Sequence, residues 1–206
     1  MPTGTPDGRR LHSRTQGDDG LHIGVDLDNT VLDATSSHLK YYNIASGLTL
    51  TPDNVNDFYL YRLYGWDKSE ADNIYHKYGH QIHWDSEPFP MAVDIMQEFY
   101  ERHRVSIITS RPVHFREVTE KWLMHHKIYY HRIVFTDDKL QECRSSNVDV
   151  LIDDGPHYAK EFAHADRQVI LFEQPYNLSV GANLVYRASN WLEVKSHIDQ
   201  LKSRLG

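Results

Sequence analysis

Short apolar segments recur along this chain, and none of them alternates apolar with polar residues. Parallel strands look like this because helices bury both faces of their sheet. The segments are residues 21–27, 105–109, 132–136, 148–152 and 168–172. We expect each of them to be a strand of one parallel sheet that is buried on both faces.

Helical patterns separate the expected strands. Residues 92–102 place Val93, Met96 and Phe99 at helical spacing, and residues 114–126 do the same just after Pro112, a residue common at helix starts. Segments 155–165 and 191–201 also place apolar residues at helical spacing. Strands that alternate with helices predict an α/β fold, a Rossmann-like doubly wound parallel sheet with right-handed crossovers.

One region interrupts the alternation. Residues 33–87 contain no strong strand but two helical stretches, 36–46 and 68–81, and many aromatic residues. We interpret 33–87 as a small helical cap inserted after the first strand, with 21–32 and 88–206 as the core domain. Most rings should pack the cap, and a minority could stack on a flat ring of a ligand. The candidates for stacking are Phe58, Tyr61, Tyr64 and Trp66.

Composition excludes several classes of protein. Of 206 residues, 40% are hydrophobic, which suits a globular domain, and the net charge of −7 disfavours binding to nucleic acid polymers or membrane surfaces. The single cysteine, Cys143, allows no disulfide within the chain. Residues 1–20 lack the apolar segment of a secretory signal, and we interpret them as a disordered leader. We expect a cytoplasmic protein.

Polar residues follow four of the expected strands at the edge where open α/β sheets bind ligands. They are Asp26 and Asp28, Thr109 and Ser110, Lys139, and the pair Asp153 and Asp154. Carboxylates that lie close together repel one another unless a cation or proton intervenes. Hydroxyls at a helix start are suited to binding phosphate. The pattern predicts a site that binds a phosphate group beside carboxylates whose repulsion is relieved by a cation or a proton.

The ordered set of motifs VDLDNTV, ITSRP, Lys139 and VLIDDGP resembles the haloacid dehalogenase (HAD) superfamily. Within it, the set is similar to the cytosolic type C 5′(3′)-deoxyribonucleotidase group and its bacterial nucleotidase relatives, over about residues 21–175. Each motif alone is weak, because a DxD or TS pair occurs often by chance. Four in this order, each after an apolar strand, form a strong signal.

The resemblance implies a two-step phosphate transfer. Asp26 would be the nucleophile that forms an aspartyl-phosphate, and Asp28 would act as acid and then as base. Thr109 or Ser110, with Lys139, would bind phosphate oxygens.

The resemblance also implies a magnesium site. Mg²⁺ would be held by Asp26, the backbone carbonyl of Asp28, and Asp154. Asp153 would lie next to this set, although Asp153 and Asp154 could exchange roles. Asp26, Asp154 and a phosphate dianion carry about four negative charges, against three positive charges from Mg²⁺ and Lys139.

Simpler structural explanations compete for each motif. The acidic pairs could cap a turn or a helix, and the hydroxyls could cap the helix that follows them. Lys139 could be a surface lysine between solvated neighbours, contributing little to stability. Arg111 could reach a phosphate or pair with an acidic residue. His76, His80 and His83 share a helix face, which could suggest zinc, but no carboxylate or cysteine completes that set.

The expected function is a phosphomonoesterase for a small phosphorylated metabolite, with a nucleoside 5′-monophosphate as the leading candidate. Gly155 stands where some relatives carry a charged residue, so nucleotide contacts cannot simply be transferred. The alternatives are a HAD phosphatase for another metabolite such as a sugar phosphate, and a non-catalytic phosphate-binding module. A phosphorylation-receiver domain is disfavoured because Asp153 and Asp154 follow the lysine. The sequence leaves a homodimer open.

Overall fold

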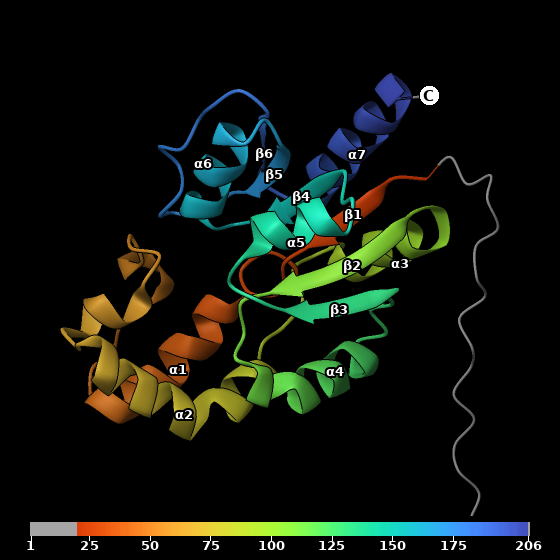
Figure 1. Ribbon diagram of the computed structural model, residues 1–206. Coiled ribbons are helices and arrows are strands. Elements are labelled where there is room, and N and C mark those ends of the chain that lie inside the picture. The colour runs from red at the N-terminus through yellow and green to blue at the C-terminus, as the bar shows by residue number, and fades with distance from the viewer. Residues whose placement is uncertain (1–19, 206) are drawn as a thin grey trace, which may run out of the picture.

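The computed structural model describes residues 20–205, and its centre is a sheet of six parallel strands (Figure 1). The strand order is β3-β2-β1-β4-β5-β6, which places the first strand in the middle. The strands are β1 (His22–Val25), β2 (Arg104–Thr109), β3 (Arg132–Phe135), β4 (Val150–Asp153), β5 (Gln168–Phe172) and β6 (Val185–Ala188). This confirms the predicted doubly wound fold. The predicted disordered leader, except Gly20, lies outside the described residues.

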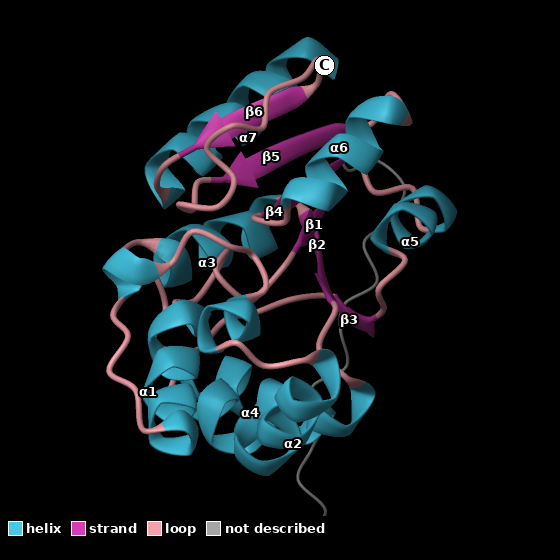
Figure 2. Ribbon diagram, turned by 90° about the vertical axis from the view of Figure 1, so that its left-hand side faces the viewer, coloured by secondary structure: helices cyan, strands magenta, loops and turns pink. Residues whose placement is uncertain are grey.

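Helices cover both faces of the sheet (Figure 2). One face packs against α3 (Ala92–Arg102), α4 (Arg116–His125) and α7 (Trp191–Leu205), and the other against α5 (Lys139–Ser145) and α6 (Pro156–His164). Consecutive strand residues serve opposite faces: Ile107 belongs to the first core cluster and Ile108 to the second. The continuous apolar runs in the sequence follow from this two-sided burial.

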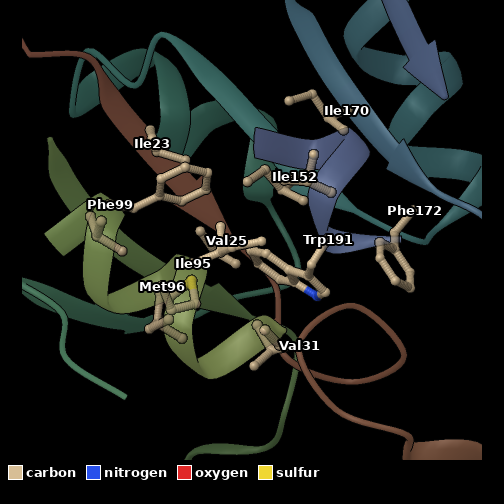
Figure 3. Packing of buried hydrophobic residues seen from close by; sticks show 14 of the residues in the cluster. Ile23, Val25, Val31, Ile95, Met96, Phe99, Ile152, Ile170, Phe172 and Trp191 are labelled. Atoms are coloured by element: carbon tan, nitrogen blue, oxygen red, sulfur yellow. The ribbon is translucent and has the colours of Figure 1, made fainter. Parts of the chain in front are cut away.

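The larger core cluster surrounds Trp191, the first residue of α7 (Figure 3). Its ring lies near Phe99 of α3 and Phe172 of β5, each with a centroid separation of 6.3 Å. The indole Nε1 donates to the backbone carbonyl of Thr30 at 2.9 Å. Trp191 therefore satisfies its polar atom while it fixes the loop that follows β1.

The insertion between β1 and α3 is helical, as expected. It contains α1 (Ala34–Ser46), two short 3₁₀ helices, η1 (Pro52–Asn54) and η2 (Leu60–Tyr64), and α2 (Lys68–Trp84). In Figure 1 the arrowheads of β2 and β3 point toward the side on which α1 and α2 lie. The insertion has its own apolar cluster, which includes Leu39, Tyr42 and Ile82.

The two chain segments that join the insertion to the core run side by side. Asp33 N donates to the carbonyl of Glu87, and Phe89 N donates to the carbonyl of Val31, both at 2.9 Å. The chain thus leaves the core and returns to it at one place. Farther along, Gly79 of α2 packs directly on Phe115, in the 3₁₀ helix η3 (Val113–Phe115) that precedes α4.

Most predicted elements are present, with shifted ends. β1 ends at Val25 rather than at residue 27, and α2 continues to Trp84 rather than residue 81. The sequence analysis missed β6 and α5. Within the part of the chain that is described, no helix has the length and apolar character required to cross a lipid bilayer.

Candidate active site

The predicted site residues line one cavity at the carboxyl ends of β1, β2 and β4, where the insertion meets the sheet. Its volume is about 430 Å³. The core contributes all the predicted residues to its lining: Asp26, Asp28, Thr109, Ser110, Lys139, Asp153 and Asp154. The insertion contributes a wall of mainly aromatic side chains, including Tyr42, Phe58, Tyr59, Tyr61 and Tyr75. Residues from distant parts of the chain therefore share one space.

Lys139 lies at the centre of the acidic cluster. It is the first residue of α5, and its Nζ donates to Asp26 Oδ1 and to Asp153 Oδ2, both at 2.7 Å. Burial alone would lower the pKa of Lys139, but Asp153 and Asp26 overcome this and raise it above its ordinary value. The lysine is only 2% exposed, so the surface-lysine interpretation is wrong, and the small contribution to stability that was expected from exposure loses its basis.

Asp26 follows the central strand directly and is buried. Its backbone N–H donates to the carbonyl of Ile152 at 2.9 Å, which continues the pairing of β1 with β4. Burial raises the pKa of the Asp26 carboxyl to about 7, against the lowering effect of Lys139. The carboxylate is thus held by one short ion pair in a place where its charge is poorly solvated.

The two adjacent aspartates at the end of β4, Asp153 and Asp154, have different surroundings. Asp153 uses both oxygens within the protein, because Oδ2 accepts from Lys139 and Oδ1 accepts from Gly155 N at 2.7 Å. Asp154 accepts at Oδ2 from the hydroxyl of Tyr176. Burial, and then the nearby charges of Asp153 and Asp26, raise the pKa of Asp154 well above its usual value.

Asp28 is paired with Arg111, the residue whose role the sequence left open. The guanidinium donates from Nε to Asp28 Oδ2 at 2.8 Å and from Nη2 to Oδ1 at 2.6 Å. A third bond joins Nη1 to Thr119 Oγ1 at 3.1 Å. Burial would raise the pKa of Asp28, but Arg111 outweighs it and holds this pKa below the usual range.

The two hydroxyl residues after β2 differ in their hydrogen bonds. Thr109 is buried, and its Oγ1 accepts from the backbone N–H of Arg111 at 3.2 Å. Ser110 Oγ lies 2.8 Å from the hydroxyl of Tyr158, which donates to the carbonyl of Asp137 at 3.1 Å. The short helix η3 has Pro112 as its N-cap, without a side-chain bond. The helix-cap interpretation of Thr109 and Ser110 is therefore wrong.

The charges of this cluster suit a small divalent cation. Asp26, Asp153 and Asp154 gather around a single ammonium group, that of Lys139, while the guanidinium of Arg111 is bonded to Asp28. Two carboxylates with waters and substrate oxygens form the kind of ligand set that Mg²⁺ prefers. The donors present therefore fit magnesium.

The histidines of α2 have other partners. His83 Nε2 lies 2.8 Å from the hydroxyl of Tyr75, and the rings of His80 and His83 both contact Phe115. The described residues contain no group of three His, Cys, Asp or Glu side chains placed to share a metal.

The aromatic candidates divide into two pairs. Phe58 and Tyr61 line the cavity. Tyr64 and Trp66 instead stack on each other at 4.7 Å between centroids and pack in the apolar cluster of the insertion.

Sequence reasoning missed the loop after β5. Tyr176 bonds to the side chain of Asp154, and Asn177 Nδ2 donates to the backbone carbonyl of Asp154 at 2.8 Å. The available signal was their position, since polar residues that follow a parallel strand reach the same edge of the sheet as the predicted site.

Comparisons with known proteins identify the family of this chain. A family model described as "5' nucleotidase, deoxy (Pyrimidine), cytosolic type C protein" matches residues 20–205. A protein of Halalkalibacterium halodurans, named as a predicted nucleotidase, is 28% identical over 188 residues, which cover 89% of this chain and 95% of that protein.

Solved structures show the same fold. A haloacid dehalogenase-like hydrolase of Streptococcus pneumoniae has a TM-score of 0.65 at 17% identity, over 87% of this chain and 98% of that one. The HAD hydrolase YfnB of Bacillus subtilis, solved with bound magnesium, has a TM-score of 0.57 at 13% identity, over 87% and 99%. The chain is thus an enzyme of the HAD superfamily and belongs to its cytosolic type C deoxynucleotidase family.

Proposed function

We propose that this enzyme is a magnesium-dependent phosphomonoesterase that forms an aspartyl-phosphate on Asp26, and that its substrates are nucleoside 5′-monophosphates. The observation that carries the proposal is the buried carboxylate of Asp26, held at 2.7 Å by Lys139 beside Asp154 at the base of a substrate-sized cavity. A carboxylate fixed in this way can attack phosphorus without rearranging its surroundings.

The proposed magnesium site consists of Asp26, Asp154 and the backbone carbonyl of Asp28. Bound Mg²⁺ would neutralise the charge of the phosphate oxygens during transfer. Asp154 is favoured over Asp153 as the direct ligand, because both oxygens of Asp153 are already bonded to Lys139 and Gly155. Asp153 instead holds Lys139 in position for Asp26 and for the phosphate.

Side chains of the protein then perform the transfer of the phosphoryl group. Asp26 attacks phosphorus, the bond from phosphorus to the ester oxygen breaks, and Asp28 gives its proton to the departing oxygen. A water that Asp28 deprotonates releases phosphate from Asp26. Thr109, whose Oγ1 accepts from Arg111 N, keeps its own proton for a phosphate oxygen. Ser110 lies beside it in the cavity wall.

The acid role of Asp28 requires a change from the arrangement in the structure. Asp28 is ionised in its pair with Arg111, so it must leave the guanidinium before it can carry a proton. We propose that residues 33–87 form a cap whose closure on bound substrate brings about this separation. The magnesium-bound structure of YfnB reveals interdomain movement in that protein, which supports the proposal of a mobile cap.

The cavity and the family support the proposed substrate class. Phe58 and Tyr61 offer aromatic surface on which a base can stack. The family description names deoxy and pyrimidine substrates and a cytosolic enzyme, and we propose the same substrate class and a cytoplasmic location for this chain.

The test uses a nucleoside monophosphate whose 5′-phosphate carries ³²P, and it measures transfer of this label to the protein. With Mg²⁺, we expect an acid-stable, hydroxylamine-sensitive phosphoenzyme in the wild type and none in Asp26→Asn, while the exposed control Asp94→Asn behaves like the wild type. Chelation should abolish turnover. A labelled Asp26→Asn protein would overturn the nucleophile, and a panel in which sugar phosphates are better substrates than nucleotides would overturn the substrate class.

A further inference from the structure

The hydroxyl of Tyr176 lies between two side chains from the carboxyl ends of neighbouring strands. Asn29 Nδ2 donates to this hydroxyl at 3.0 Å, and the hydroxyl donates to Asp154 Oδ2. Asn29 follows β1 and Asp154 follows β4, while Tyr176 belongs to the loop after β5. The tyrosine therefore connects three separate segments at the proposed metal site.

The direction of each bond is determined by its partners. Asn29 Oδ1 accepts from Thr35 N at 2.9 Å and from Thr35 Oγ1 at 3.0 Å, so the oxygen of its amide must face α1. The Asn29 nitrogen must then face Tyr176, which receives a hydrogen bond and keeps a single proton to donate. In the structure this proton goes to Asp154 Oδ2.

The same loop also fixes the backbone around this bond. Asn177 Nδ2 donates to the carbonyls of Asp154 and Phe172, each at 2.8 Å. Gln174 Nε2 donates to the carbonyl of Asn29 at 2.9 Å. Because both ends of the Tyr176 bridge are anchored to one loop, the carboxylate of Asp154 has little freedom to turn.

We propose that Tyr176 is a positioning residue that presents Asp154 to the divalent cation, and that Asn29 orients Tyr176 for this task. The inference rests on the proposed function, since it takes Asp154 as the metal ligand. Hydrogen bonds that hold a ligating carboxylate in its binding orientation lower the cost of ordering it when the metal arrives. Without the hydroxyl, Asp154 must be ordered by the metal itself.

The test is the affinity for Mg²⁺ itself, titrated calorimetrically into the metal-free full chain without substrate. Tyr176→Phe removes one oxygen and keeps the ring that contacts Phe58 at 5.5 Å between centroids. We expect its Kd to rise about 10- to 100-fold. The matched control is Tyr64→Phe, whose hydroxyl donates to Asn43 Oδ1 at 2.9 Å within the insertion. Its Kd should equal that of the wild type.

Turnover provides a second readout that distinguishes positioning from a general structural defect. In Tyr176→Phe, the Mg²⁺ concentration for half-maximal rate should rise by the same factor as Kd, while kcat at saturating Mg²⁺ recovers. An unchanged Kd in Tyr176→Phe, or an equal rise in Tyr64→Phe, overturns this inference alone. Failure of the wild type to bind Mg²⁺ overturns the proposed function as well.

Discussion

Replacing Lys139 by Met tests how the acidic cluster is held together. The lysine is 2% exposed and bonds to Asp26 and Asp153 at 2.7 Å each, so its removal leaves two buried carboxylates without their shared partner. Breaking a buried ion pair by removing one partner costs about 3–5 kcal/mol. We expect a loss of that size in the free energy of unfolding at pH 7, although methionine fills most of the space.

Urea denaturation at a series of pH values measures this loss. In Lys139→Met, Asp26 loses the cation that lowers its pKa, so the native state should bind the Asp26 proton more tightly than in the wild type. The deficit in stability relative to the wild type should therefore shrink as the pH falls from 7 toward 5. The control Lys121→Met removes an exposed lysine paired with Glu117 and should leave the unfolding midpoint unchanged. A Lys139→Met protein as stable as this control at pH 7 would refute the reasoning.

Three further predictions concern other parts of the molecule. Asp28→Asn removes the proposed acid, so kcat/KM for a nucleoside monophosphate should fall at least about tenfold more than kcat/KM for p-nitrophenyl phosphate, whose leaving group needs no acid. Equal losses would contradict the acid role. Burial lowers the pKa of His22, so on acidification the unfolded chain binds the His22 proton before the native state does. The free energy of unfolding should therefore fall below about pH 6.5, by up to ~1.4 kcal/mol per pH unit. His22→Gln should reduce this slope in urea titrations. Gly79→Ala would place a Cβ 2.2 Å from Phe115 Cζ and should cost about 1–3 kcal/mol in thermal unfolding, whereas Gly181→Ala, in open space, should not.

The fold was predictable where burial dictated the sequence. Inner strands such as β4 read as continuous apolar runs because helices cover both of their faces. β6 lies at the edge of the sheet, pairs only with β5, and includes half-buried Tyr186 and Arg187, so its sequence lacks such a run. α5 has only seven residues, too few for a clear helical period.

The site was predictable where charge had to gather at strand ends, as at Asp26 and Asp154. The burial of Lys139 was not, because its neighbours Asp137 and Asp138 are exposed. Asp138 is the N-cap of α5 and faces solvent, and the next residue turns inward on the first helical turn. Whether Arg111 contacts a phosphate or Asp28 depends on the distances between segments that are far apart in the sequence. A local sequence pattern does not contain these distances.

The insertion begins and ends at one place, where Asp33 N donates to the Glu87 carbonyl and Phe89 N donates to the Val31 carbonyl, and this has an evolutionary consequence. Because the chain departs from and rejoins the sheet at adjacent points, a segment of any length or shape can be grafted there without moving a single strand. Exchange of this segment alone would therefore change the wall that the insertion contributes to the cavity, while the strand ends beneath it keep their places.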